Sequence, residues 1–159
     1  MIRQDRTNAQ ASVLDRLVDT EPRRSREAVQ RRLFDSEQIR AAVVRDLENL
    51  LNTRRRITVP PKGFVELKCS LHVYGLPDFS SENPKSPLFQ RKLLQTIEQT
   101  VVRFEPRLKN VSVRLDTSAR RERGFSFRIA GVLVVEPLNE PVVFDSYYDA
   151  GRGSYVVSG

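Results

Sequence analysis

Apolar residues recur at helical spacing in a first stretch between residues 36 and 53. Just before it, Asp35 offers an N-cap and Gln38 follows three residues later, which is a capping-box pattern. The apolar stripe consists of Ile39, Val43, Leu47, Leu50 and Leu51. This pattern predicts a helix over residues 36–53 with its apolar face on the core. Asn52 opens the basic, proline-containing stretch "NTRRRITVPPKG", which is typical of a loop.

A second amphipathic stretch covers residues 87–104. Ser86 is a favoured N-cap residue, and Pro87 stands in the first helical position, where its missing N–H does no harm. Leu94 and Val102 widen the stripe, so we expect this helix to be buried on two sides. The stripe itself consists of Phe89, Leu93, Ile97, Val101 and Phe104.

Alternation of apolar and polar residues, the period of a half-buried strand, appears at several places outside the two helices. It predicts a first strand at residues 64–71, a second at 111–116 and long third and fourth strands at 125–135 and 142–150. The tail, residues 151–159, adds a short edge strand. The sequence therefore predicts an α+β fold, with N-terminal helices and a long central helix packed on a small, mainly antiparallel sheet formed by the C-terminal half.

The first part of the chain differs in character from the rest. Residues 12–20 place Leu14 and Leu17 on one helical face, and the charged stretch "EPRRSRE" follows. We interpret residues 1–34 as a docking arm and linker, and residues 35–159 as a single domain. The alternative is a first helix packed on the protein's own core.

Composition narrows the classes of protein. The chain has 159 residues, 39% of them hydrophobic, which is enough for one domain with a core. Cys69 is the sole cysteine and His72 the sole histidine, which excludes an internal disulfide and a zinc site built on these residue types. The N-terminus has no apolar signal region, and no segment approaches the roughly 20 apolar residues that span a bilayer, so we expect a soluble cytoplasmic protein.

The net charge of +7 and the pI of about 10.1 raise the question of an anionic partner. Charged residues make up 30% of the chain, and arginines alternate with acidic residues through most of it, as on solvated helix faces. No aromatic residues are interleaved with a basic cluster, so we expect no nucleic-acid site.

Catalytic patterns are weak. The stretch "GRGS" has neither the following helix nor the further glycines of a phosphate-binding loop and predicts a turn. Asp46 and Glu48 are two residues apart on a helix and therefore diverge, whereas Glu48 and Glu105 remain a conceivable acid and base of a glycosidase. The alternative function is thus a muramidase-like peptidoglycan hydrolase, and the sequence predicts no cofactor and no metal.

The stretch "RFEPRL" places a carboxylate at the negative end of a helix dipole. Glu105 there costs about 0.3–1 kcal/mol unless a cation answers it, and Pro106 prevents the helix from continuing. We expect Glu105 and Arg107 to project outward together from a corner set by Pro106. The alternatives are an ion pair between the two residues and a pairing of Glu105 with an arginine of residues 40–56.

Four segments occur in the order and spacing of one family: "SVLDRLVD" from residue 12, "VVRDLENLLNTRR" at 43–55, "SLHVYGLPDF" at 70–79 and "FEPRL" at 104–108. Over residues 12–150 the chain resembles the TssE family, the small baseplate wedge proteins of type VI secretion systems, which are similar to a wedge protein of contractile phage tails. His72 and Val73 depart from the Leu-Asn that members of the family often have.

The resemblance implies a structural protein without a substrate, located in the cytoplasm at a baseplate on the inner face of the inner membrane. It implies docking on other baseplate wedge proteins (TssF, TssG and TssK) and an edge of the sheet offered to sheath subunits (TssB and TssC). The residues expected to bind partners are Leu14, Leu17, Tyr74, Gly75, Leu76, Pro77, Asp78, Glu105, Pro106 and Arg107.

Overall fold

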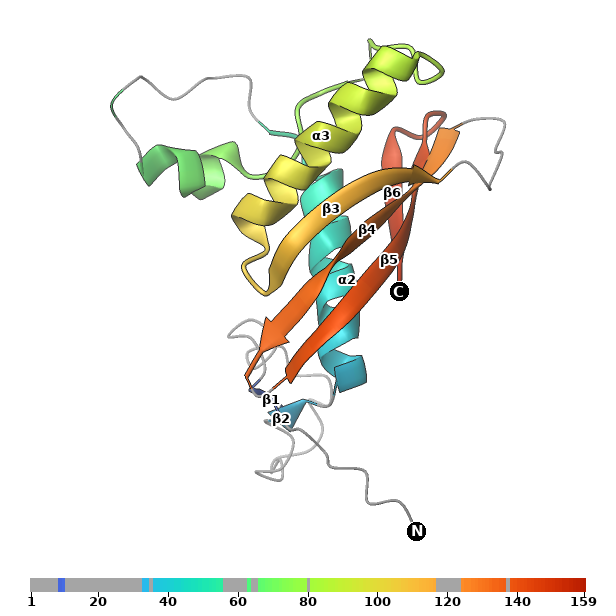
Figure 1. The fold of residues 1–159 in the computed structure, drawn as a ribbon. Coiled ribbons are helices and arrows are strands. Elements are labelled where there is room, and N and C mark those ends of the chain that lie inside the picture. Colours follow the sequence, from blue (N-terminus) through green and yellow to red (C-terminus); the bar gives the residue numbers. More distant parts are fainter. Residues whose placement is uncertain are drawn as a thin grey trace, which may run out of the picture.

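The computed structural model describes residues 9–10, 33–34, 36–55, 63, 66–79, 81–116, 124–136 and 138–159. Its elements, drawn in Figure 1, are β1 (Ala9–Gln10), β2 (Leu33–Phe34), α2 (Ser36–Asn52), η2 (Glu66–Cys69), η3 (Leu71–Val73), α3 (Pro87–Phe104), β3 (Leu108–Asp116), β4 (Gly124–Val135), β5 (Leu138–Asp149) and β6 (Ser154–Ser158). The predicted α+β fold is confirmed. The arm helix expected at residues 12–20 and the N-cap expected at Asp35 lie outside the described residues.

Both long helices form where the sequence predicts them. Ser86 caps α3 by accepting a hydrogen bond from the backbone N–H of Phe89 at 3.5 Å, and Pro87 occupies the first position. The expected stripes of both helices lie in the core, apart from Phe104, which is half-buried. The expectation that α3 is buried on two sides is wrong at Val102, which is 58% exposed, because no described element covers that flank.

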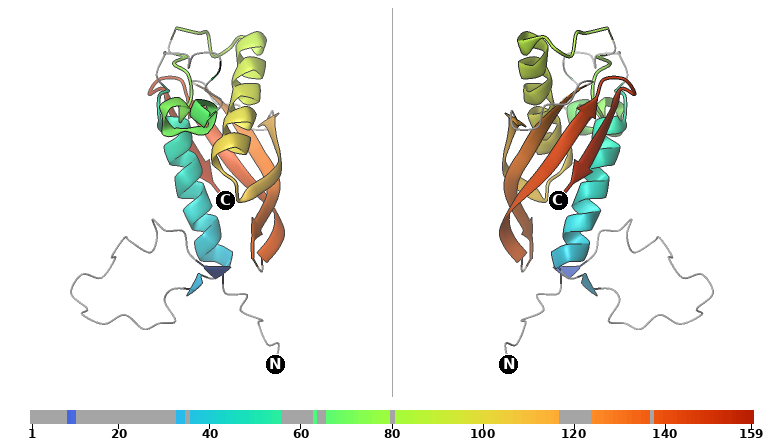
Figure 2. Two further views of the ribbon diagram at one scale, coloured as in Figure 1. Left: turned by 90° about the vertical axis from the view of Figure 1, so that its left-hand side faces the viewer. Right: turned by 90° about the vertical axis from the view of Figure 1, so that its right-hand side faces the viewer.

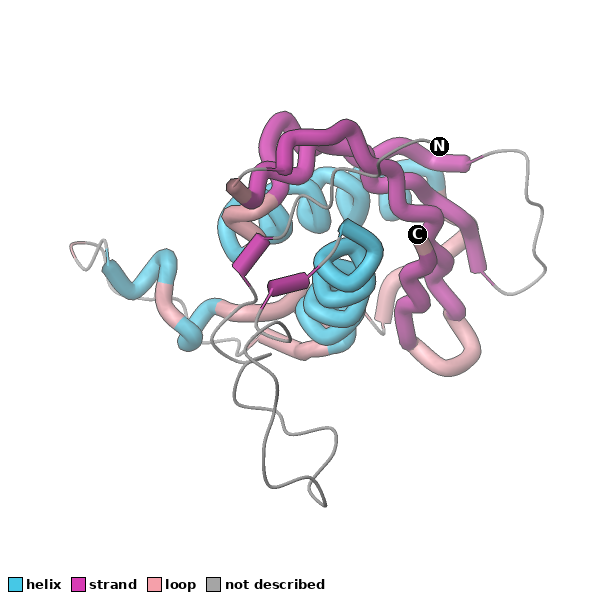
Figure 3. The backbone as a smooth tube through the Cα atoms, turned by 90° about the horizontal axis from the view of Figure 1, so that it is seen from below, coloured by secondary structure: helices cyan, strands magenta, loops and turns pink. Residues whose placement is uncertain are grey.

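The C-terminal half forms an antiparallel sheet in the order β3-β4-β5-β6. Alternate residues of the strands face the core, and Phe127, Ile129 and Phe144 are fully buried there. Both long helices lie on this side of the sheet (Figure 2), and the strands curve around α2, which Figure 3 shows end-on. Residues on the opposite face, such as Val143 and Val156, are about half exposed.

A bulge interrupts the pairing of β3 with β4 between Lys109 and Ser112. Asn110 lies in it with a φ of 52°, a left-handed conformation that asparagine tolerates better than most residues. Because a bulge increases local twist, it helps β3 to follow the curvature of the sheet.

The strand predicted at residues 64–71 is wrong. The described part of this segment forms the 3₁₀ helices η2 and η3, closed by local hydrogen bonds such as Val73 N–H to the Ser70 carbonyl at 3.1 Å. Ser70 also caps η3 by accepting from the N–H of His72. An alternating pattern favours a strand only where a neighbouring strand supplies backbone partners, and η2 and η3 pair with none of the described strands.

An aromatic cluster fills one end of the core between β4, β5 and β6. Tyr148 and Tyr155 stack with ring centroids 4.8 Å apart, and Phe127 meets Tyr155 edge-on at 6.4 Å. Burial, followed by the charge of Tyr148, raises the pKa of Tyr155 well above its ordinary value of 10.0. Burial also raises the pKa of Tyr148.

This cluster predicts a loss of stability in alkaline solution. As pH rises above about 10, an unfolded tyrosine releases its proton whereas the folded protein retains it, so the free energy of unfolding falls. The contribution is fully present below the unfolded pKa and disappears as pH rises through the folded one. Urea unfolding across this range should show a flatter decline for Tyr155→Phe than for the wild type, and equal slopes would contradict the assignment.

Ser146 interrupts the apolar face of β5. It is 5% exposed, and its hydroxyl is the one buried side-chain polar atom of the described residues without a hydrogen-bond partner. Because an unsatisfied buried group carries a desolvation cost, we expect Ser146→Ala to raise the free energy of unfolding by about 1 kcal/mol. Ser126→Ala, on the opposite face, serves as the control and should change it by less than about 0.5 kcal/mol. A loss of stability in Ser146→Ala would show that the hydroxyl has a partner.

Candidate functional site

A tight corner joins α3 to β3. Glu105 ends the helix, its backbone N–H bonding the Val101 carbonyl at 2.8 Å, while Pro106 follows and blocks a further turn. The Glu105 carbonyl then accepts from the N–H of Leu108 at 3.1 Å, where β3 begins. We call residues 105–107 the EPR corner.

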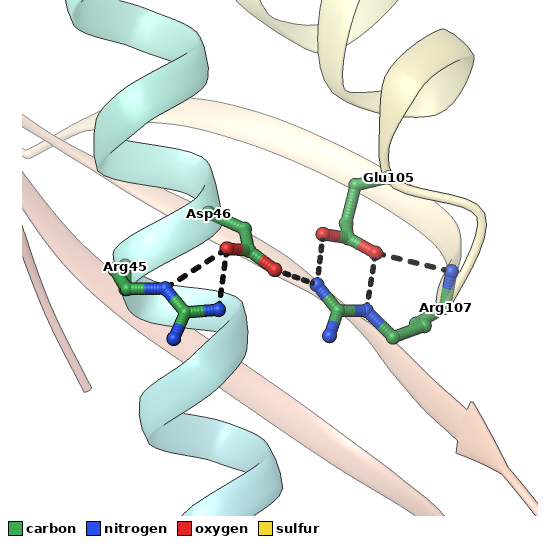
Figure 4. Close-up of polar contacts among 4 residues, drawn as sticks. All are labelled: Arg45, Asp46, Glu105 and Arg107. Atoms are coloured by element: carbon green, nitrogen blue, oxygen red, sulfur yellow. Dashed lines mark hydrogen bonds and ion pairs between the residues drawn. The ribbon is translucent and has the colours of Figure 1, made fainter. Parts of the chain in front are cut away.

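Arg107 binds carboxylates from two directions (Figure 4). Its Nε and Nη2 donate to Oε1 and Oε2 of Glu105 at 2.7 and 2.6 Å, a bidentate pair, and Nη2 also donates to Oδ2 of Asp46 on α2 at 2.6 Å. The other oxygen of Asp46 accepts from Arg45 at 2.9 and 3.1 Å. The four side chains thus form one network that connects the middle of α2 to the end of α3.

The expectation that Glu105 and Arg107 project outward is wrong. Glu105 is 4% exposed and the Arg107 side chain 22%, and their pairing confirms the alternative of an ion pair between the two residues. The short turn after Pro106 returns the guanidinium onto the preceding carboxylate. The third member, Asp46, appeared in the sequence only as a residue diverging from Glu48, because a contact across 61 positions leaves no local pattern.

Electrostatics resolve the unfavourable position of Glu105 at the negative end of α3, because Arg107 provides the cation that this helix end requires. Burial by itself would lower the pKa of Arg107, but the hydrogen bonds and charges of Glu105 and Asp46 outweigh it and hold this pKa above its ordinary value. Burial, and then the negative charges of Asp46 and Glu105, raise the pKa of nearby Tyr74.

The loop at residues 74–79 lies beside this corner and is attached to the end of α2 through backbone bonds. The N–H of Leu76 donates to the Thr53 carbonyl at 2.8 Å, and the N–H of Arg55 donates to the Leu76 carbonyl at 2.7 Å. Gly75 has a φ of 93°, and a Cβ on it would lie 2.2 Å from the Thr53 carbonyl oxygen. Only glycine therefore fits this close approach.

The structure separates the expected partner-binding residues of this loop into two groups. Leu76 and Gly75 are buried, and the ring of Tyr74 packs edge-on against Phe104 with centroids 5.2 Å apart. Pro77 is half-buried and Asp78 exposed, the latter 3.6 Å from Arg54.

Of the other expected residues, Pro106 is exposed. Leu14 and Leu17 lie outside the described residues.

The geometry does not favour the hydrolase alternative. Both carboxylate oxygens of Glu105 bind Arg107, and the α2 carboxylate that reaches the same guanidinium is Asp46 rather than Glu48. Within the described ranges, no three His, Cys, Asp or Glu side chains gather in a way that could hold a metal ion. None of the described helices is long and apolar enough to cross a membrane.

A comparison with models of protein families assigns this chain to a family. The family model for "Baseplate wedge protein gp25" matches residues 36–138, which is more than half of the chain and includes the EPR corner and the 74–79 loop. The chain therefore belongs to the gp25 family of baseplate wedge proteins, and the predicted kinship with small wedge proteins is confirmed.

A solved chain from a structure described as "The baseplate complex from the type VI secretion system" is similar at 20% identity with a TM-score of 0.46, covering 70% of this chain and 94% of that one. A search of curated protein sequences found no match.

The ion network predicts a structural role for Arg107. In Arg107→Ala the nearly buried Glu105 carboxylate keeps its desolvation cost and loses its partner, so we expect the free energy of unfolding to fall by about 2–4 kcal/mol. Chemical denaturation measures this change. Arg45→Ala, which removes the exposed outer arginine of the same network, should cost about 0–1 kcal/mol. If both variants lowered the free energy of unfolding by the same small amount, the predicted stabilising role of Arg107 would be wrong.

Proposed function

We propose that this protein is a structural component of a type VI secretion baseplate, which docks on larger wedge proteins and offers its sheet to the first ring of sheath subunits. The observation that carries the proposal is the family match over residues 36–138, together with the motif register that resembles TssE. The expected site is the cytoplasmic side of the inner membrane, reached through the baseplate. The expected partners are the wedge proteins TssF, TssG and TssK and the sheath subunits TssB and TssC.

The docking surface that we propose combines the EPR corner with the adjoining loop. The ion network holds Pro106 at an exposed position, and the backbone bridge to α2 holds the half-buried Pro77 and the exposed Asp78 in a defined geometry. A surface that is already rigid loses little conformational entropy on binding, which favours assembly. Glu105 and Arg107 then act mainly by shaping the corner, with the exposed fraction of Arg107 available to a partner.

The sheet supports the second part of the proposal. Beyond the end of β6, the edge of β5 from Leu138 to Phe144 is unpaired among the described strands. An exposed strand edge with free backbone groups can accept a strand from another chain. Initiation of a sheath by backbone pairing needs an edge of this kind.

Substitution of Pro106 separates docking from folding. Pro106→Asp places a charge on the exposed turn without removing any member of the ion network, so we expect a nearly unchanged melting temperature and loss of co-purification with the larger wedge proteins. In a host lacking the gene, wild-type protein should restore assembly of a fluorescently labelled sheath, whereas the variant should not.

The matched control is Gln99→Asp, which adds the same charge to an exposed position of α3. It should support assembly like the wild type. Normal sheath assembly in the deletion strain itself would refute the baseplate proposal, and full activity of Pro106→Asp would remove the corner from the docking surface.

A further inference from the structure

The outer edge of β6 is occupied by a side chain that imitates a neighbouring strand. Asn52, the last residue of α2, donates through Nδ2 to the Tyr155 carbonyl at 2.8 Å and accepts from the Tyr155 N–H through Oδ1 at 2.9 Å. These are the two bonds that a residue of an added antiparallel strand would make. Nδ2 also donates to the Glu48 carbonyl at 2.9 Å, which holds the amide in place.

The opposite edge of the sheet has a similar device. Glu98 on α3 accepts from the backbone N–H of Val113 on β3 at 3.0 Å through Oε2. That N–H points away from β4, because an N–H that bonds a helix side chain is not available to the ladder. Each edge strand of the sheet therefore has one backbone position bonded by a helix side chain: Tyr155 near the start of β6 and Val113 within β3.

The first half of β5 is, among the described strands, a longer stretch of edge on which none of these side-chain bonds falls. Among the described strands, β6 pairs with β5 only from Asp145 to Asp149. Backbone groups alternate in direction along a strand. Tyr155 directs its N–H away from β5, so its partner Tyr148 directs its own backbone groups toward β4. Pro141, an odd number of residues from Tyr148, therefore directs its nitrogen toward the open edge. A proline is tolerated there because its missing N–H is not needed by β4.

The surface where β6 ends is hollowed. A surface hollow lies between Ser158 and Gly159 and the first turns of α2, where Arg40, Ala41 and Val44 line it. Arg40 reaches Glu140 of β5 at 3.1 Å, so this ion pair joins the helix to the unpaired half of the strand.

We propose that Asn52 and Glu98 are specificity residues that close the two edges of the sheet to backbone pairing with a second copy of this chain. An extended segment of another protein is thereby directed to β5 between Leu138 and Phe144. The first part of this proposal, that Asn52 and Glu98 block the two edges, rests on the hydrogen bonds alone. The second part, that a segment of another protein pairs with β5, rests on the proposed function. Natural sheets commonly prevent edge-to-edge association by covering or blocking their edge strands.

The test measures self-association of the purified full chain. Asn52→Ala frees both backbone groups of Tyr155 for hydrogen bonds to a second copy, so self-association should tighten by about tenfold. Sedimentation velocity over a range of concentrations measures this change. Asn49→Ala, one turn earlier on the exposed face of α2, should behave like the wild type.

A second pair of variants tests the other edge and keeps the proposal testable if Asn52→Ala does not fold. Glu98→Ala removes the acceptor for Val113 and should associate more strongly, whereas Glu98→Gln retains an acceptor oxygen and should not. Amide exchange at Val113 should accelerate in dilute Glu98→Ala and slow again at high concentration. Such protection does not arise from a merely structural role.

Folded variants that keep the wild-type association state at every concentration would overturn the proposal. Tighter association of Asn52→Ala and Glu98→Ala would support it whether or not a sheath needs this protein, so its outcome is distinct from that of the baseplate proposal. Val143→Pro tests whether another protein pairs with β5, because it removes an edge N–H of that strand. This variant should reduce sheath assembly in the complemented host, and undiminished assembly would refute pairing at β5.

Discussion

One guanidinium joins the two helices to the start of the sheet. Arg107 stands at the first turn after α3, binds the carboxylate that ends α3 and reaches across to Asp46 on α2. Since the same turn leads directly into β3, the contact joins both helices and the start of the sheet at one point. A buried ion pair of this kind contributes modestly to net stability. Any conformation that buries one of the charges without its partner is strongly destabilised. The corner therefore specifies geometry more than it adds free energy.

This arrangement changes the interpretation of the EPR motif. A motif that binds a partner directly needs free donors and acceptors at the surface. Here both carboxylate oxygens of Glu105 are occupied internally, and what remains accessible is Pro106 and a fraction of Arg107. In the docking role proposed above, the motif presents a shape to a partner, and its charges keep that shape rigid. The loop at residues 74–79 follows the same principle, because Leu76 and Phe79 are buried and its attachment uses backbone atoms.

The sequence predicts those features whose causes are local. The stripe from Ile39 to Leu51, the Ser86 cap with Pro87 and the alternation in β4 each encode one element within one segment, and the structure has them at nearly the expected boundaries. The strand β5 was also expected, but it begins at Leu138, four residues before the predicted start at residue 142. The strand predicted at residues 64–71 was wrong because an alternating pattern does not reveal whether a neighbouring strand is present. The partners Asp46 for Arg107, Asn52 for Tyr155 and Glu98 for Val113 lie too far apart in the chain for any pattern to connect them.

The positions of the 74–79 loop differ in which residues they can hold, and Gly75 is strongly restricted. The loop meets the end of α2 at a backbone-to-backbone distance that leaves no room for a methyl group, so even alanine at this position would collide with the Thr53 carbonyl. Pro77 and Asp78, two and three residues further on, have side chains that reach solvent, and that of Asp78 lies 3.6 Å from Arg54. During evolution, such a loop can change its exposed side chains while its backbone keeps the same position. If this loop docks on a partner as proposed, its exposed side chains can change with that partner while the fold of this protein stays the same.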